Sequence, residues 1–155
     1  MPADLWRFAE AFYQRPEVEP VCLQLQAQGA DVCLLICAVW LEVRQVACDD
    51  VRTAALADLA RPWQCDVVQP LRHTRQAWRA LAQSDSALAL LRERLKQLEL
   101  LAEREQLERL AELSRDWPNA AAAEPVDWLE RLAPVAAERA ALHILRSAAT
   151  QLATN

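Results

Sequence analysis

Glycine is nearly absent from this sequence of 155 residues, which contains only Gly29. Strand-rich proteins use glycine at turns and bulges, and phosphate-binding loops need several glycines close together. The scarcity of glycine therefore favours helices and argues against a loop that cradles a nucleotide. Phenylalanine and tyrosine are also rare, but 54% of the residues are hydrophobic, which excludes disorder by composition.

A long apolar run is missing, and we expect no secretory leader. The longest apolar run covers residues 32–41, whereas a membrane-spanning helix needs about 20 apolar residues. The N-terminus becomes polar within four residues and shows no apolar segment typical of a leader. The five cysteines form an odd number and show no disulfide pattern. We therefore expect a protein of the reducing cytoplasm that has no contact with a membrane.

The sequence is also short of positive charge, with a net charge of −5. Binding to nucleic acid needs clustered Lys and Arg side chains, so this balance argues against a nucleic-acid partner. The charges are unevenly distributed along the chain. Residues 1–60 hold four basic and nine acidic side chains, whereas residues 61–82 hold one acid and a row of four arginines, Arg61, Arg72, Arg75 and Arg79.

The spacing of apolar and helix-breaking residues predicts an all-α protein with a single domain over residues 1–155. The fourth helix should end before Pro62, and Pro70 should either kink the next helix or lie in the first turn of a new one. Gly29 is expected as a left-handed residue after a helix. N-caps are expected at Asp4, Asp31, Asp49 and residues 84–86. The predicted helices cover residues 4–14, 16–28, 32–44, 49–60, 63–82, 86–116, 126–133 and 135–152.

The helix over residues 32–44 is apolar on every side from Val32 to Leu41. A helix without a polar face must be surrounded by protein, so we expect a bundle built around this central helix. Trp40 and Trp78 have the spacing of core residues. Two further tryptophans, Trp117 and Trp128, flank an alanine-rich linker, and we expect them to dock the C-terminal helices rather than to mark a partner surface.

The helix over residues 86–116 has no breaker and should be about 45 Å long. A compact domain of this size has a radius of gyration of only about 15 Å, so this helix must span the body, bend or project from it. Its apolar stripe is interrupted by Gln106, and this favours packing within the molecule over a coiled coil. The stripe consists of Leu88, Leu91, Leu95, Leu98, Ala102, Leu110, Leu113 and Trp117.

Part of the sequence resembles a known family. The residues that carry the resemblance are Asp4-Leu5-Trp6, Phe8-Ala9, Tyr13, Pro16, Val18, Cys22-Leu23, Leu25-Gln26, Gly29, Asp31-Val32, Leu35, Trp40-Leu41, Val67-Val68, Pro70-Leu71-Arg72 and Arg75. Over roughly residues 4–80, they resemble an uncharacterised proteobacterial family of helical proteins of about this length. The resemblance implies a bacterial cytoplasmic protein in which residues 4–82 are the shared half and residues 83–155 add the long helix and the C-terminal helices. It implies no activity, cofactor or catalytic residue.

The arginine row is the strongest candidate for a binding site. On a helix, Arg72, Arg75 and Arg79 fall within about 60° of one another, and Arg61 lies upstream. The planar guanidinium group suits carboxylates and phosphates, so the row could bind an anionic ligand or an acidic partner. The alternative is that the row pairs with acids of the same chain, and the candidates are Glu10, Glu17, Asp49 and Asp50.

No arrangement of residues with catalytic or metal-binding spacing is found. Cys33 and Cys37 share a helix face but lack further ligands, and we expect all five cysteines to pack as small hydrophobic side chains. His73 and His143 have no partner at ligand spacing. The pair Asp49-Asp50 lacks the second acidic cluster that would bridge a diphosphate through metal ions, so we interpret it as a helix cap.

We therefore predict a non-enzymatic, cytoplasmic module that binds another protein, with no cofactor, metal or catalytic residue. Its binding surface would be the long helix, the row of Arg61, Arg72, Arg75 and Arg79, or both. The alternative is a helical bundle that binds a small anionic or amphiphilic ligand between the helices around residues 32–44 and 64–82.

Overall fold

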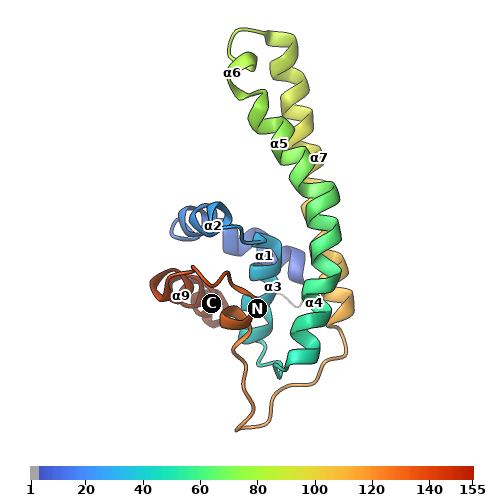
Figure 1. Ribbon diagram of the computed structural model, residues 1–155. Helices are drawn as coiled ribbons and strands as arrows, with labels where there is room; N and C mark the ends of the chain where they lie inside the picture. Colours follow the sequence, from blue (N-terminus) through green and yellow to red (C-terminus); the bar gives the residue numbers. More distant parts are fainter. Residues whose placement is uncertain (1–3) are drawn as a thin grey trace.

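The protein is all-helical, as the sequence predicts; the computed structural model describes residues 4–155 (Figure 1). Within this range the only extended pairing is a single bridge between Val46 and Asn119. The helices are α1 Leu5–Tyr13, α2 Val18–Ala27, α3 Val32–Val43, α4 Asp50–Trp63, the π-helical turn η1 Gln64–Val68, α5 Gln69–Ala77, α6 Arg79–Ala82, α7 Ser86–Leu113, α8 Trp128–Leu132 and α9 Arg139–Thr154. No described helix has both the length and the apolar character needed to cross a membrane.

Helix α3 is the centre of the fold. Every residue from Cys33 to Leu41 is buried, and α3 packs against α1, α2, α4, α7, α8 and α9. The expectation of a central helix surrounded by protein is therefore confirmed. Burial of this many apolar side chains supplies the main driving force for folding, because each fully buried large side chain contributes about 1.5–3 kcal/mol.

The predicted helix boundaries are confirmed where a side chain or a glycine defines them. Asp4, Asp31, Asp49 and Asp85 each accept a backbone N–H bond at the start of a helix. Gly29 has a φ of 92°, a left-handed conformation that a residue with a Cβ rarely adopts. The Ala30 N–H then bonds to the Leu25 carbonyl oxygen and closes the end of α2.

The predicted end of the fourth helix before Pro62 is wrong. Helix α4 includes Pro62, and the chain stays helical through η1 into α5, where Pro70 lies in the first turn. Proline lacks an N–H donor, and its ring crowds the carbonyl group four residues earlier. Within η1 the Gln69 N–H bonds to the Gln64 carbonyl oxygen, five residues back, and this wider turn accommodates the proline that follows it.

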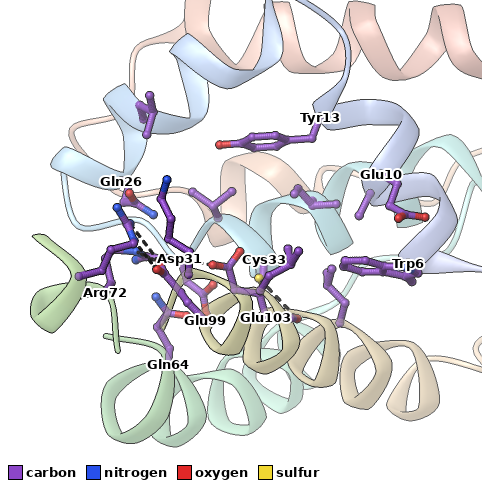
Figure 2. Close-up of a pocket in the computed structure, with 18 of the residues that line it drawn as sticks. Trp6, Glu10, Tyr13, Gln26, Asp31, Cys33, Gln64, Arg72, Glu99 and Glu103 are labelled. Atoms are coloured by element: carbon purple, nitrogen blue, oxygen red, sulfur yellow. Dashed lines mark hydrogen bonds and ion pairs between the residues drawn. The ribbon is translucent and has the colours of Figure 1, made fainter. Parts of the chain in front are cut away.

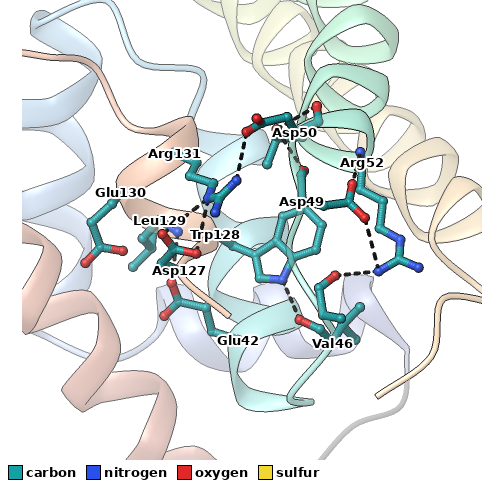
Figure 3. Close-up of polar contacts among 12 residues, drawn as sticks. Glu42, Val46, Asp49, Asp50, Arg52, Asp127, Trp128, Leu129, Glu130 and Arg131 are labelled. Atoms are coloured by element: carbon teal, nitrogen blue, oxygen red, sulfur yellow. Dashed lines mark hydrogen bonds and ion pairs between the residues drawn. The ribbon is translucent and has the colours of Figure 1, made fainter. Parts of the chain in front are cut away.

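The C-terminal segment is anchored to α3, as the two tryptophans predicted. Trp128 is fully buried, stacks on Trp117 with a ring-centre distance of 5.6 Å and donates from Nε1 to the Val46 carbonyl oxygen at 2.8 Å (Figure 3). Glu42 of α3 accepts from the Leu129 N–H at 2.8 Å and from Arg146 Nε of α9 at 2.7 Å. Helices α8 and α9 are therefore held to the centre by both apolar and ionic contacts.

The long helix projects from the body of the molecule. In Figure 1, α5, α6 and the first part of α7 form a helical hairpin that extends beyond α1, α2, α3 and α9. We call residues 69–95 the arm and the remaining helical part the body. The arm contains no buried residue, since the first buried side chain of α7 is Glu99. Trp78, predicted for the core, is only partly buried in the arm.

The predicted apolar stripe of α7 is wrong in part. Ala102 and Leu110 are buried, but Leu91, Leu98 and Leu113 are exposed. Two polar side chains, Glu99 and Gln106, are buried on the helix instead. The reason is that the neighbours of α7 change along its length, from α5 and α6 near its start to α1, α3 and α4 further on.

Candidate functional site

Two of the four predicted arginines meet on one glutamate of the long helix. Arg72 Nε lies 3.1 Å from Glu99 Oε1, and Arg75 contacts the same carboxylate with Nε at 2.5 Å and Nη2 at 3.2 Å. The Glu99 side chain is only 7% exposed. A buried charge needs such partners because its desolvation is otherwise costly. The three side chains therefore fasten α5 to α7 where the arm meets the body.

The other two arginines lie apart from this cluster. Arg61 is exposed on α4 and pairs with Asp58 at 3.6 Å. Arg79 is exposed on the short helix α6 at the far end of the arm. The four arginines therefore do not form one surface, and their binding of an external partner stays a prediction.

The acids that were expected to pair with the arginine row have other contacts. Arg72 and Arg75 pair within the chain, but their partner comes from α7, which lies beside α5. Of the four acids expected as partners, Glu10 lines the pocket described next. Glu17 instead contacts Arg15. Asp49 contacts Arg52 and Asp50 contacts Arg131 (Figure 3).

A pocket of about 610 Å³ lies where the arm joins the body, and we call it the junction pocket (Figure 2). Cys33, Ile36 and Leu107 are buried residues of its wall, and the exposed Tyr13 and Leu100 lie at its rim. The Arg72, Arg75 and Glu99 cluster lines it as well. Its volume lies within the range of pockets that hold small molecules.

Gln64 enters the wall of the junction pocket from the π-helical turn η1. The residue is 6% exposed, and within residues 4–155 its Oε1 atom has no hydrogen-bond partner. An unpaired buried acceptor costs about 1–3 kcal/mol, so a donor placed beside it is stabilised. Single π-helical turns occur frequently at functional sites.

Glu103 is a partly buried carboxylate of the pocket. Its Oε1 lies 3.7 Å from Arg72 Nη2, and no residue of the described chain donates a hydrogen bond to it. Burial raises the pKa of Glu103 to about 7; Arg72 lowers this pKa, and Glu99 raises it further. The carboxyl group therefore titrates near neutral pH.

Asp31 is a second carboxylate on the same side of the pocket, and it is better satisfied than Glu103. Its Oδ1 accepts the Leu34 N–H as the cap of α3, and its Oδ2 accepts from Gln106 Nε2 at 2.6 Å. Burial raises the pKa of Asp31, while these hydrogen bonds act in the opposite direction. The buried Gln106 thus has a structural role that explains why a polar residue interrupts the apolar stripe.

The comparisons with known proteins place this arrangement in a family. Residues 4–110 match the family described as "Protein of unknown function (DUF2390)". The chain belongs to this family. The match extends beyond residues 4–80, over which the resemblance was recognised, and it includes the arm and every residue of the junction pocket. No curated protein and no solved structure matches the chain.

Sequence reasoning missed three residues of the DUF2390 region that define the pocket: Gln64, Glu99 and Glu103. A signal for the two glutamates was present, because they lie four residues apart on the long helix and so share a face with each other. Their pairing with the arginine row depends on α5 folding back along α7, which spacing alone does not reveal. Gln64 carries no signal, since the π-helical turn that directs it inward was not predicted.

A second candidate surface is formed by exposed leucines of α7, within the residues that match the DUF2390 family. Leu90, Leu91, Leu98 and Leu101 are between 51% and 64% exposed, and we call them the outer leucine face. Leu91, Arg94, Leu98 and Leu101 follow one another at intervals of three and four residues, so they share one side of the helix. Clusters of exposed apolar residues often mark sites of interaction.

The buried cysteines are not reactive thiols. Four of the five are buried, as expected, but Cys65 is exposed on η1, which the expectation of packing did not foresee. Burial raises the pKa values of Cys22 and Cys37 to about 12 and also raises that of Cys33. The thiolate is the nucleophile and metal ligand, so these thiols are inert. Within residues 4–155 no group of three or more His, Cys, Asp or Glu side chains could hold a metal ion.

Proposed function

We propose that the protein is a non-enzymatic module of the bacterial cytoplasm that binds another protein through the outer leucine face of α7. The observation that carries this proposal is the exposure of Leu90, Leu91, Leu98 and Leu101 on one projecting helix. Exposure of these leucines to water is unfavourable, and a partner that covers them would gain about 25 cal/mol for each Å² of apolar surface buried. The unpaired cysteines and the resemblance of the sequence support the bacterial cytoplasm as its location.

The spacing of the outer leucine face favours an amphipathic helix as the partner. A helix that packs along α7 would contact apolar residues spaced three and four positions apart. Amphipathic helices bind their partners through apolar residues with this spacing. Arg94 lies within the face, and Glu105 lies one turn beyond Leu101. The partner helix is therefore expected to combine an apolar stripe with charges of both signs at its edges.

Site-specific photo-crosslinking in the native host cell tests this proposal. A photoreactive amino acid in place of Arg94 should give a discrete crosslinked species, and the same residue in place of Gln76, exposed on α5, should not. The double change Leu91→Ser and Leu98→Ser should abolish the species. Its composition, read by mass spectrometry, distinguishes a heterologous partner from a second copy of the chain. Equal crosslinking from both positions, or no effect of the double change, would contradict the proposal.

A second candidate function, the binding of a small amphiphilic or anionic molecule, is favoured by the junction pocket. The pocket lies between the two helical segments that the sequence suggested for such a site, with α3 on one side and α5 on the other. Ligand-induced stabilisation tests this function: a ligand of the folded state raises the melting temperature, because it does not bind the unfolded chain.

A further inference from the structure

We propose that the junction pocket binds a small organic cation, an ammonium or guanidinium group carried on an apolar or aromatic stem. The inference rests on the second candidate function, ligand binding in this pocket, and specifies the charge and shape of the ligand. It differs from the anionic ligand that the arginine row suggested, because the structure shows where those arginines are directed.

Two polar groups of the pocket are acceptors that lack a donor, whereas the Lys96 ammonium that also lines it is half exposed and lies 3.9 Å from Glu93. Glu103 receives no hydrogen bond from any described residue, and the buried Gln64 Oε1 is without a partner in the same part of the chain. An ammonium group has three donors and no acceptor, and a guanidinium group has five donors and no acceptor. A cationic head group would therefore supply donors of the kind that Glu103 and Gln64 lack, whereas a carboxylate or phosphate beside them would bring only further acceptors.

The arginines of the pocket are already occupied. Arg72 and Arg75 both direct Nε to Glu99, at 3.1 Å and 2.5 Å. With its amide oxygen turned toward Arg72, Gln26 also accepts from Nη1 at 3.0 Å and from Nη2 at 3.2 Å. An anion would have to break these bonds and leave the buried Glu99 without its partners, which is strongly destabilising.

The rest of the pocket suits an apolar stem. In Figure 2, Gln64 lies on one side of Glu103 and Trp6 on the other, with Tyr13 above. Ile36 also contributes to the wall of the pocket. An aromatic or alkyl group that extends from the cationic head would therefore contact Trp6, and aromatic side chains provide large apolar contact areas.

A metal ion does not fit this chemistry. The described residues contain no group of three His, Cys, Asp or Glu side chains placed to hold one. Divalent ions such as Ca²⁺ require six to eight oxygen ligands, and Mg²⁺ requires near-octahedral coordination. The Glu103 carboxylate and the Gln64 amide oxygen instead match the few polar groups that orient an organic ligand in an apolar pocket.

Isothermal titration with three matched compounds tests the proposal. The compounds are phenylpropylammonium, phenylbutanoate and phenylpropanol, which share an aromatic stem and carry a positive, a negative and no charge. At a pH above the pKa of Glu103, phenylpropylammonium should bind at least about tenfold more tightly than the other two, because a close pair of opposite charges is worth more than a neutral contact.

Two variants and a matched control identify the groups involved. Glu103→Gln should weaken binding of phenylpropylammonium about tenfold or more and leave phenylpropanol unaffected, since it removes only the charge. This variant should fold, because it removes a carboxylate whose ionised form burial disfavours. Gln64→Leu should weaken the same ligand to a smaller extent. Glu105→Gln is the control: it is the same change on the same helix, outside the pocket and paired with Arg109.

The outcomes distinguish ligand binding in the junction pocket from the positive charge proposed for the ligand. Preference for phenylpropylammonium that is lost in Glu103→Gln and kept in Glu105→Gln supports the proposal. Tighter binding of phenylbutanoate would overturn the cationic ligand but retain ligand binding in this pocket. Binding that Glu103→Gln and Glu105→Gln reduce equally would overturn the assigned head-group site. If none of the three compounds binds, both the cationic ligand and the second candidate function are wrong.

Discussion

The body and the arm are both helical, but only the body has an interior. In α3 nine consecutive residues, from Cys33 to Leu41, are buried because helices pack on every side. In the arm, which pairs two helices, no residue is buried and leucines remain in contact with solvent. The comparison shows that the number of neighbouring helices, rather than hydropathy alone, determines whether a leucine contributes to the core.

The largest expected difference between the two regions comes from the same substitution in each. Leu41→Ala removes a fully buried side chain from α3 and should lower the free energy of unfolding by about 4 kcal/mol, through lost burial and a new cavity. Leu91→Ala, in the arm, removes a side chain that is 56% exposed and should change the free energy of unfolding by less than about 0.5 kcal/mol. Urea denaturation measures both values.

A result with equal losses for the two variants would show that another chain covers the outer leucine face in solution. Repetition at low and high protein concentration distinguishes this case, because stability that depends on association increases with concentration. Leu23→Ala, on α2 and 52% exposed, is a matched control outside the arm.

The second largest effect on stability is expected from the ion pairs that join the arm to the body. Glu99→Ala leaves Arg72 and Arg75 without their shared partner and should destabilise the protein by about 3 kcal/mol, the lower end for breaking a buried pair. Hydrogen exchange should show faster exchange in α5 than in α3, since α5 has no buried residue of its own.

Glu93→Ala provides the control for this prediction. Glu93 is 64% exposed and lies 3.9 Å from Lys96, and a surface pair of this kind contributes at most about 1 kcal/mol. If Glu99→Ala were as mild as Glu93→Ala, the pairing at the base of the arm would not hold α5 to α7.

The parts of the fold that could be predicted are those set by local sequence. Aspartate caps, the left-handed Gly29 and the apolar character of α3 depend on residues close together in the chain, and the structure confirms all of them. The docking of the C-terminal segment through Trp128 was also predicted correctly. The segment has few other large apolar side chains, so burial of this tryptophan against the body is the favourable arrangement.

The parts that could not be predicted depend on contacts between distant segments. The sequence predicts that α4 ends before Pro62, because proline has no N–H to donate to the helix. The helix nevertheless continues, since its packing against α7 compensates for that missing hydrogen bond. The buried face of α7 is set by its changing neighbours, so Glu99 lies inside and Leu98 outside. The junction pocket combines residues of α1, α2, α3, η1, α5 and α7, and its Gln64, Glu99 and Glu103 were not singled out from the sequence.

The smallest expected effect is a pH dependence that arises where the two regions meet. Burial raises the pKa of Glu103 from 4.5 to about 7, so the folded protein holds this proton more tightly than the unfolded chain. The free energy of unfolding should therefore fall as pH rises between these values, by about 1–2 kcal/mol after allowance for solvent screening. The charged and titratable groups that face Glu103 are Arg72, Arg75, Glu99, Asp31, Tyr13 and Cys33.

Glu103→Gln isolates this contribution, because glutamine is neutral at every pH in the window. Urea midpoints for the variant should fall less steeply with pH than those of the unchanged protein, and the two should differ most above the pKa of Glu103. Asp31 retains its own raised pKa in both proteins, so some slope should remain in the variant. Parallel curves would mean that Glu103 is as well solvated in the folded protein as in the unfolded chain, and that the junction pocket does not desolvate it.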